Sequence, residues 1–183
     1  MNGPQRKLLL LLMLGLMAPL ASAGIASLFG SPISSPPPYE FLGTGMSVKS
    51  EVYTAGDMYL YTYRLTNDTQ VQQVVSWFSV DVEGADILSV GHDTGSSVPP
   101  LWQEVGDPVI SVDALFLDPY FSAGESSTVL YFFSADAPGT STASLGRTGT
   151  VVSREIIAPV PEPATLAILA LGTGLSLCRR KGN

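Results

Sequence analysis

The chain has 183 residues, enough for one domain of ordinary size, and a formal net charge of −7 at pH 7. All sixteen acidic residues lie between Glu40 and Glu162, and five of the nine basic residues lie at the two ends. The stretch from Gly24 to Glu162 therefore holds four basic and sixteen acidic residues, a charge of −12. This charge argues against binding to nucleic acid or to anionic headgroups, because phosphate is bound by cationic surfaces.

The first 23 residues have the three parts of a secretory signal peptide. A short basic region is followed by the leucine-rich stretch 8–17, and Ala21 and Ala23 supply small residues ahead of a cut before Gly24. The apolar stretch is shorter than the roughly 20 residues that a membrane-spanning helix needs. We therefore predict a leader at 1–23, export through Sec-type machinery and removal of the leader by signal peptidase.

A Ser/Pro-rich linker is predicted at 24–40, because the sequence GSPISSPPP suits neither a helix nor a central strand. A β-rich domain is predicted at 41–158, from alternating apolar residues and aromatic runs separated by turn residues. The predicted strands are 46–53, 58–65, 74–82, 87–90, 109–117 and 128–133.

Two of these strands have clear inner rows. Alternation predicts that Phe78 faces the core and Trp77 the opposite side. The residues expected to face the core in the two strands are Met46, Val48, Val52, Phe78, Val80 and Val82. Helical periodicity is absent between the ends, so we predict an all-β fold, an antiparallel β-sandwich of Ig-like or jelly-roll-like type. Helices are expected only as an N-terminal signal helix and a C-terminal apolar helix flanking the sandwich.

No set of residues predicts catalysis or a metal centre. Asp93-Thr94-Gly95 matches the tripeptide of aspartic proteases, but that mechanism needs two carboxylates, and the composition around this single copy is that of a turn. His92 is the only histidine, and the one cysteine, Cys178, lies in the C-terminal tail. We therefore expect no enzyme activity, no cofactor, no structural zinc and no disulfide.

A binding role stays open as an alternative. Trp102 could stack on a sugar ring, with Tyr39 or Tyr120 beside it, although a core tryptophan is the default. Loop carboxylates could bind calcium, although no EF-hand spacing is present and solvation of a secreted domain explains them as well. The carboxylates concerned form two groups, Asp81, Glu83 and Asp86, and Asp107, Asp113 and Asp118. Asn67-Asp68-Thr69 matches a glycosylation acceptor, but we interpret it as a turn.

The C-terminal segment, 159–183, has three parts. Val160, Pro161, Glu162 and Pro163 form a stiff, extended strip, because proline disfavours helix at the residue before it. The apolar run 164–178 would span only about 22 Å as a helix, short of the roughly 30 Å hydrocarbon core. The basic cluster that follows, which the positive-inside rule keeps in the cytoplasm, is Arg179, Arg180 and Lys181.

Together these three parts resemble the PEP-CTERM sorting signal of exported proteins in Gram-negative bacteria. The resemblance implies processing by an exosortase, a transient stay in the inner membrane through the tail, and a final place at the cell surface or outside the cell. It also makes extracellular polysaccharide a candidate partner. The alternative is an ordinary single-pass anchor that contains Pro-Glu-Pro by chance, which the short apolar run disfavours.

Two functions follow from these predictions. The first is a non-catalytic surface or extracellular-matrix protein that the tail delivers. The second is an extracellular module that binds carbohydrate or calcium. The exposure of Trp102 would discriminate between them.

Overall fold

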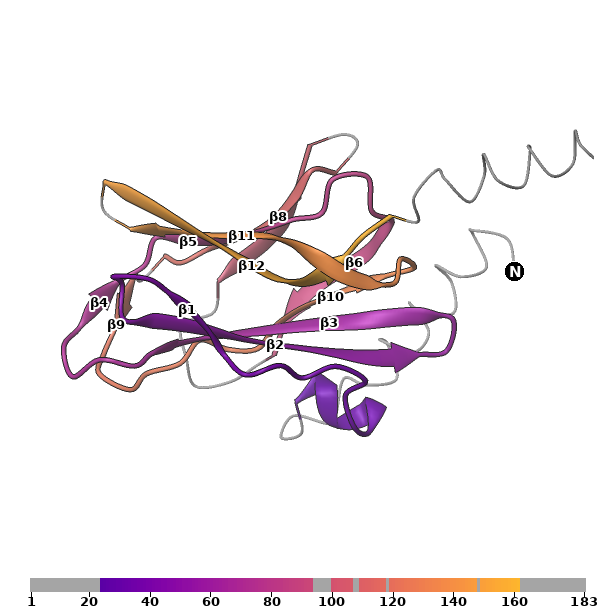
Figure 1. The fold of residues 1–183 in the computed structure, drawn as a ribbon, viewed down its shortest axis with the longest axis horizontal. Helices are drawn as coiled ribbons and strands as arrows, with labels where there is room; N and C mark the ends of the chain where they lie inside the picture. Colours follow the sequence, from indigo (N-terminus) through magenta and orange to yellow (C-terminus); the bar gives the residue numbers. More distant parts are fainter. Residues whose placement is uncertain (1–23, 94–99, 107–108, 118, 148, 162–183) are drawn as a thin grey trace, which may run out of the picture.

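Two five-stranded antiparallel sheets lie face to face in the computed structural model, which describes residues 24–93, 100–106, 109–117, 119–147 and 149–161 (Figure 1). The first sheet consists, in spatial order, of β1 (Tyr39–Phe41), β2 (Met46–Ala55), β3 (Met58–Asn67), β10 (Leu130–Ser134) and β6 (Ile87–His92). The second consists of β12 (Thr150–Pro159), β11 (Pro138–Arg147), β5 (Trp77–Asp81), β8 (Ser111–Leu115) and β7 (Leu101–Val105). A small two-stranded sheet pairs β4 (Gln73–Val74) with β9 (Tyr120–Phe121).

The sheets share one hydrophobic core, so the predicted all-β antiparallel sandwich is confirmed. At one edge of the sandwich β1 lies against β12, and at the other β6 lies against β7. The predicted inner rows of β2 and β5 are also confirmed, because Met46, Val48, Val52, Phe78, Val80 and Val82 are all buried. Trp77 lies on the opposite face of β5, with its indole over Gly146 of β11, where any larger residue would collide with the ring.

Aromatic side chains join the two sheets. The ring of Tyr61 stacks on Phe132 with centroids 5.3 Å apart, and the ring of Tyr63 packs on Phe78 of the second sheet at 5.9 Å. The hydroxyl of Tyr63 donates to the carbonyl of Ile157 in β12 at 2.9 Å. Burial raises the pKa of the Tyr63 phenol well above its usual value, so this group stays a neutral hydrogen-bond donor.

A buried asparagine ties the end of β3 to a distant loop. The Asn67 side-chain nitrogen donates to the carbonyls of Val71, Phe121 and Ser122 at 2.8, 3.0 and 2.9 Å. Its side-chain oxygen accepts bonds from the backbone and the hydroxyl of Thr69. Asn67 is 0% exposed, so its amide is a structural group of the turn and is not presented for glycosylation.

Several strands differ from the prediction. The predicted strand 74–82 is two elements, β4 and β5, and 109–117 is shortened to β8. The hairpin of β11 and β12 is absent from the predicted strands, because β11 is rich in Ser, Thr and Gly and begins with Pro138 and Gly139, which are typical of turns. Strands β1, β7 and β9 are short and were missed for the same lack of pattern.

Residues 24–35, part of the predicted linker, are attached to the first sheet: 24–29 cover its outer face, and 33–34 bond to the backbone of β2. They begin with a 3-10 helix, η1 (Ile25–Phe29), and continue to a bridge between Ser34 and Val52 of β2. Ile25 and Phe29 cover Tyr53, Leu60 and Phe133 in a second hydrophobic cluster. This cover explains why Tyr53 is buried, although it alternates with the inward-facing Val52 and so lies on the outer face of β2.

Both predicted flanking helices, the signal helix and the C-terminal apolar helix, fall within 1–23 and 162–183, outside the described residues. The described part of the chain contains no helix except the single short turn η1. None of it forms a helix with the length and apolarity needed to cross a membrane.

Candidate functional site

The start of the predicted sorting motif is held against the sandwich. Strand β12 ends at Pro159, paired with Pro138, and Val160 donates its backbone N–H to the carbonyl of Ala137 at 3.1 Å. The Val160 side chain fills the space beside Gly139, and Pro161 lies against Gly84. The motif therefore follows the last strand without a spacer.

The other residues predicted for processing fall outside the described part of the chain. They are Ala21, Ala23, Glu162, Pro163, Arg179, Arg180 and Lys181. Gly24, predicted as the first residue after the leader, is described and lies directly before η1.

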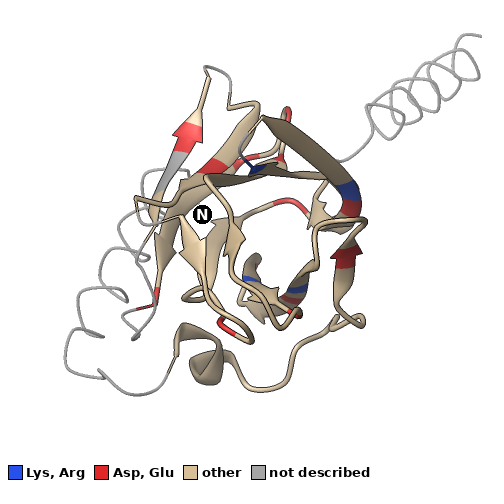
Figure 2. Ribbon diagram, turned by 90° about the vertical axis from the view of Figure 1, so that its left-hand side faces the viewer, with Lys and Arg blue, Asp and Glu red and all other residues tan. Residues whose placement is uncertain are grey.

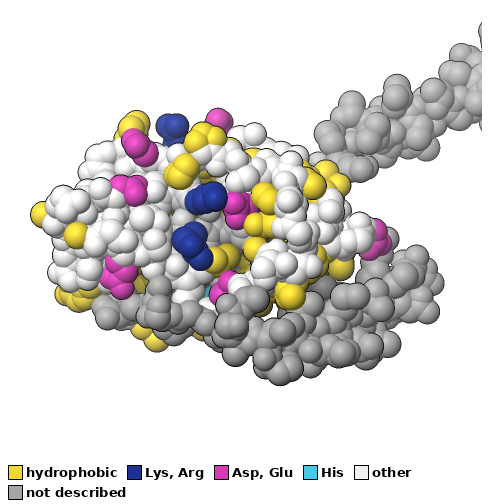
Figure 3. Space-filling model, turned by 90° about the horizontal axis from the view of Figure 1, so that it is seen from below, with side chains coloured by type: hydrophobic (Ala, Val, Ile, Leu, Met, Phe, Trp, Pro, Cys, Tyr) yellow, Lys and Arg dark blue, Asp and Glu magenta, His cyan; other side chains and the backbone are white. Residues whose placement is uncertain are grey.

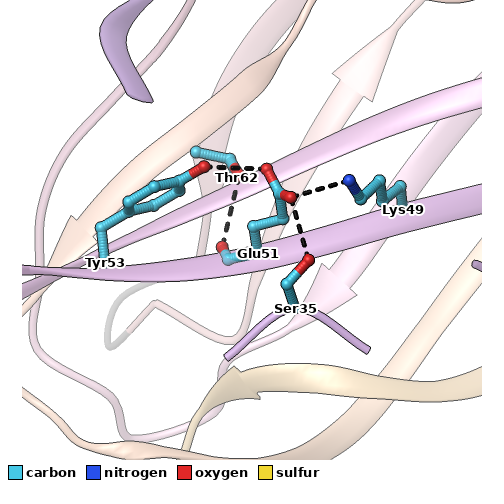
Figure 4. A network of polar contacts seen from close by, with 5 residues as sticks. All are labelled: Ser35, Lys49, Glu51, Tyr53 and Thr62. Atoms are coloured by element: carbon cyan, nitrogen blue, oxygen red, sulfur yellow. Dashed lines mark hydrogen bonds and ion pairs between the residues drawn. The ribbon is translucent and has the colours of Figure 1, made fainter. Parts of the chain in front are cut away.

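A polar network that the sequence did not predict lies on the outer face of the first sheet (Figure 4). One Glu51 oxygen accepts a bond from Ser35 at 3.0 Å and lies 2.8 Å from the Lys49 ammonium. The other accepts a bond from the Tyr53 hydroxyl at 2.8 Å. Thr62 donates to the Glu51 backbone carbonyl at 3.3 Å. The network fastens residue 35 of the N-terminal segment to strand β2.

The network changes the acidity of two groups. Burial raises the pKa of Glu51, but hydrogen bonds from Lys49, Tyr53 and Ser35 outweigh it, so the pKa lies below the usual value. Burial and the hydrogen bond to Glu51 raise the pKa of Tyr53 to about 12. A depressed carboxyl pKa contributes stability above the unfolded pKa of about 4.5 and loses it as the pH falls through the folded value.

We expect Glu51→Gln to lower the free energy of unfolding at pH 7 by about 0.5–1 kcal/mol, a small value because the pair with Lys49 is partly solvated. The loss should shrink below pH 4, where Glu51 of the unchanged protein takes up a proton. Urea denaturation at pH 7 and pH 3.5 measures both effects. Glu40→Gln, the same change at an exposed position of β1, is the matched control and should change little at either pH. An equal loss at both pH values would contradict the role of the charge.

An open cavity of about 270 Å³ lies beside this network. It is lined by residues of the N-terminal segment, β2, β3 and the end of β6, which include Gly24, Ser27, Lys49, Glu51, Arg64 and Asp93. Lys49 and Arg64 stand directly opposite each other on β2 and β3. Figure 3 shows basic side chains gathered in the middle of the face that carries η1, which contrasts with the acidic character of the domain.

Two of the carboxylates proposed for calcium accept local hydrogen bonds. The carboxylate of Asp81 accepts the backbone N–H of Glu83 at 3.1 Å, and that of Asp113 accepts the Ser79 hydroxyl at 2.6 Å. Asp107 and Asp118 lie outside the described residues. Within the described ranges, no three His, Cys, Asp or Glu side chains are placed to hold one ion. Figure 2 shows acidic residues distributed over both sheets and their turns.

Trp102 lies on β7, at the edge of the second sheet, and its side chain is outside what the structure describes. Tyr39 was considered as a neighbour, but it lies on β1, at the opposite edge of the sandwich. Tyr120 belongs to the small sheet and is 53% exposed. Of the two tyrosines considered as neighbours of Trp102, Tyr39 therefore lies on a strand at the other edge of the sandwich.

Asp93 and His92 do not form an acid–base pair. The His92 ring nitrogen Nδ1 lies 3.1 Å from the backbone carbonyl of Asp93, and the Asp93 carboxylate instead accepts the backbone N–H of Ile25 at 3.0 Å. Thr94 and Gly95 lie outside the described residues. The sequence did not predict this contact, since nothing in the pattern links residue 93 to residue 25.

Comparison with known proteins identifies the tail. Residues 159–181 match the family model of the PEP-CTERM protein-sorting motif. A search of curated proteins finds no match to the chain.

Two solved structures resemble the fold at low similarity. One is a GH20 exo-β-N-acetylglucosaminidase from Vibrio harveyi in complex with N-acetylglucosamine, with 12% identity and a TM-score of 0.39; the match covers 64% of this chain and 19% of that one. The other is an uncharacterized protein from Nocardia farcinica with an immunoglobulin-like fold, with 12% identity and a TM-score of 0.41, covering 63% of this chain and 90% of that one. At these values neither likeness supports a transfer of function.

Proposed function

The chain carries a PEP-CTERM protein-sorting motif, and from this we propose that it is an exported, non-catalytic protein of the cell surface or extracellular matrix, sorted by an exosortase. The match at residues 159–181 is the observation that carries the proposal. In this proposal the leader at 1–23 directs export, the tail holds the chain transiently in the inner membrane, and exosortase acts at the Pro-Glu-Pro strip. The sandwich is the part that is delivered.

The position of the motif, directly after the last strand, supports the separate roles proposed for the tail and the sandwich. Because β12 ends at Pro159, only four residues, 160–163, separate the last strand from the apolar run that starts at 164, so the two are at most about 18 Å apart along the chain. The folded domain therefore stands close to the membrane face while the tail is in place. The first two residues of the strip are held on the domain, Val160 by its bond to Ala137 and Pro161 by its contact with Gly84.

A carbohydrate- or calcium-binding role has less support. Within the described residues no carboxylate group is arranged for an ion, and the side chain of Trp102 is not among them.

Intact-mass analysis of the protein from the membranes and the culture supernatant of its own host tests the proposal. We expect a mature form that starts at Gly24 and lacks the apolar run and the basic cluster, found outside the inner membrane. A protein that keeps Arg179 to Lys181 and stays in the inner membrane would show a plain anchor and contradict exosortase sorting. A purified mature form that hydrolyses peptides or polysaccharides would contradict the non-catalytic part.

A further inference from the structure

Gly24 and Ile25 face a single carboxylate. Asp93, at the end of β6, accepts the backbone N–H of Ile25 on one oxygen at 3.0 Å. A Cβ atom built on Gly24 would lie 2.6 Å from the other oxygen of the same carboxylate. Both oxygens of Asp93 are therefore directed at the first two residues of the N-terminal segment.

The backbone nitrogen of Gly24 is close enough to feel this charge. Standard bond lengths place a residue's nitrogen about 2.5 Å from its Cβ position, so the nitrogen of Gly24 lies within about 5 Å of the nearer Asp93 oxygen. Opposite charges at roughly 4–6 Å shift each other's protonation markedly. In the precursor this nitrogen belongs to the peptide bond with Ala23 and is neutral.

Removal of the leader changes the charge at this point. Hydrolysis of the Ala23–Gly24 bond adds the hydroxyl of water to the carbonyl carbon of Ala23 and leaves the Gly24 nitrogen as a free amine. An α-amine has a pKa of about 7.7–8.0, so the amine takes up a proton at neutral pH. A positive charge then stands where the carboxylate of Asp93 already points.

We propose that Asp93 is the binding site for the α-ammonium group that leader removal creates at Gly24, and that this ion pair fastens residues 24–29 to the sandwich. The inference rests on the proposed function for the cut before Gly24. In the precursor the carboxylate lacks this cation, so processing adds an ion pair to contacts that already hold the segment on the sheet.

The segment that the pair secures covers an apolar surface. Ile25 is buried against Tyr53, Leu60 and Phe133, and the ring of Phe29 meets Phe133 edge-on with centroids 6.0 Å apart. Loss of this cover would expose aromatic and aliphatic side chains on the outer face of the first sheet. Ser27 strengthens the turn, since its backbone N–H and hydroxyl both donate to the Gly24 carbonyl, at 2.9 and 2.8 Å.

Other charged groups face this site. Lys49 and Arg64 line the same cavity and oppose an ammonium, but the Lys49 charge is paired with Glu51. Burial and the Asp93 carboxylate raise the pKa of the Tyr131 phenol, which keeps it neutral. Among the described residues, Asp93 is therefore the anion nearest to Gly24.

The site also explains why residue 24 is a glycine. A contact of 2.6 Å is shorter than real Cβ atoms make, so a larger residue would push the carboxylate away from the N-terminus. Gly24→Ala is therefore a second way to weaken the pair without removing its charge.

The test compares two chains purified in detergent, one that runs from Gly24 to Asn183 with a free amine and one that retains Ala23. The second chain has the same sandwich, but its ammonium lies one residue, about 3.5 Å, further along. The pH dependence of α-amine acetylation, followed by mass spectrometry, gives the pKa of each amine. We expect the amine of Gly24 to have a pKa about one unit above that of the Ala23 chain.

Asp93→Asn and Gly24→Ala should each remove most of this difference. Asparagine keeps an oxygen for the Ile25 N–H, so the change isolates the charge. Equal pKa values in the Gly24 and Ala23 chains would overturn the inference, and this comparison alters no residue of the sandwich. An exported protein whose mass shows a different first residue would also overturn it, whereas failure of tail removal alone would contradict the sorting proposal and leave the ion pair standing.

Discussion

Replacing Asn67 by aspartate should lower the free energy of unfolding by about 3–5 kcal/mol at pH 7. The side-chain nitrogen of Asn67 donates to three backbone carbonyls, and the residue is fully buried. In the variant a carboxylate oxygen takes the place of that nitrogen, so a buried negative charge faces three carbonyl oxygens. The loss of the donor and the unpaired charge act in the same direction.

The acidic range provides a second check on this prediction. A carboxyl group at position 67 favours its neutral form in the folded state, so its folded pKa is raised above the unfolded value of about 3.9. The difference in unfolding free energy between the variant and the unchanged protein should therefore be smallest near pH 4 and grow as the pH rises. Guanidinium denaturation at pH 4 and pH 7 measures the change.

Asp68→Asn is the matched control for this substitution. It replaces a carboxylate by an amide, the reverse exchange, at the next and exposed position of the same turn. We expect it to change the free energy of unfolding by less than about 0.5 kcal/mol. Similar losses at positions 67 and 68 would show that the turn is generally fragile. That result would contradict the conclusion that the three hydrogen bonds of the Asn67 side chain stabilise the fold.

The second large effect is expected in sorting. Glu162→Gln should leave the tail uncut and shift most of the protein to the inner membrane fraction, because the charge between the two prolines is the only charge in the strip that exosortase is proposed to bind. Immunoblots of fractionated cells, with intact-mass analysis of the tail, measure the outcome. The sandwich should be unaffected, so thermal unfolding of the purified domain should stay unchanged.

Glu155→Gln supplies the matched control for sorting. It is the same substitution on an exposed position of β12, seven residues before Glu162, and it changes the net charge equally. We expect it to be processed as the unchanged protein is. Normal processing of Glu162→Gln would show that exosortase does not recognise the glutamate. Retention of both variants in the inner membrane would show that net charge causes the effect.

The strands that could be predicted are those in which side-chain pattern and burial agree. β2, β3, β5 and β10 carry alternating or aromatic residues, and Phe78 and Phe132 lie in the core as such patterns require. β11 gave no signal because Ser and Thr occupy its outward positions and only Ala143 and Leu145 are buried apolar residues. Its identity depends on pairing with β12 and β5, which is decided by tertiary contacts.

Of the candidate sites, the sequence alone reveals the sorting motif but not the two sites that depend on tertiary contacts. The sorting motif is a contiguous sequence with its own chemistry, so residues 160–163 could be identified without a structure. The Glu51 network and the contact between Ile25 and Asp93 join residues that are 16 and 68 positions apart. Contacts between residues so far apart in sequence form only when the N-terminal segment folds back on the sheet. The one local hint was that Lys49, Glu51 and Tyr53 share the outer face of their strand.

The absence of a spacer between β12 and the sorting motif has a kinetic consequence. A chain exported from its N-terminus can form the first sheet, including the surface that receives Gly24, once residue 134 has emerged. The second sheet needs β12, whose last residue precedes the apolar run by only a few positions. The final strand therefore becomes available at nearly the moment when the tail enters the membrane. Its pairing with β11 is a local hairpin, an element that forms within about 1–10 μs, so the last strand joins the second sheet without a long-range search.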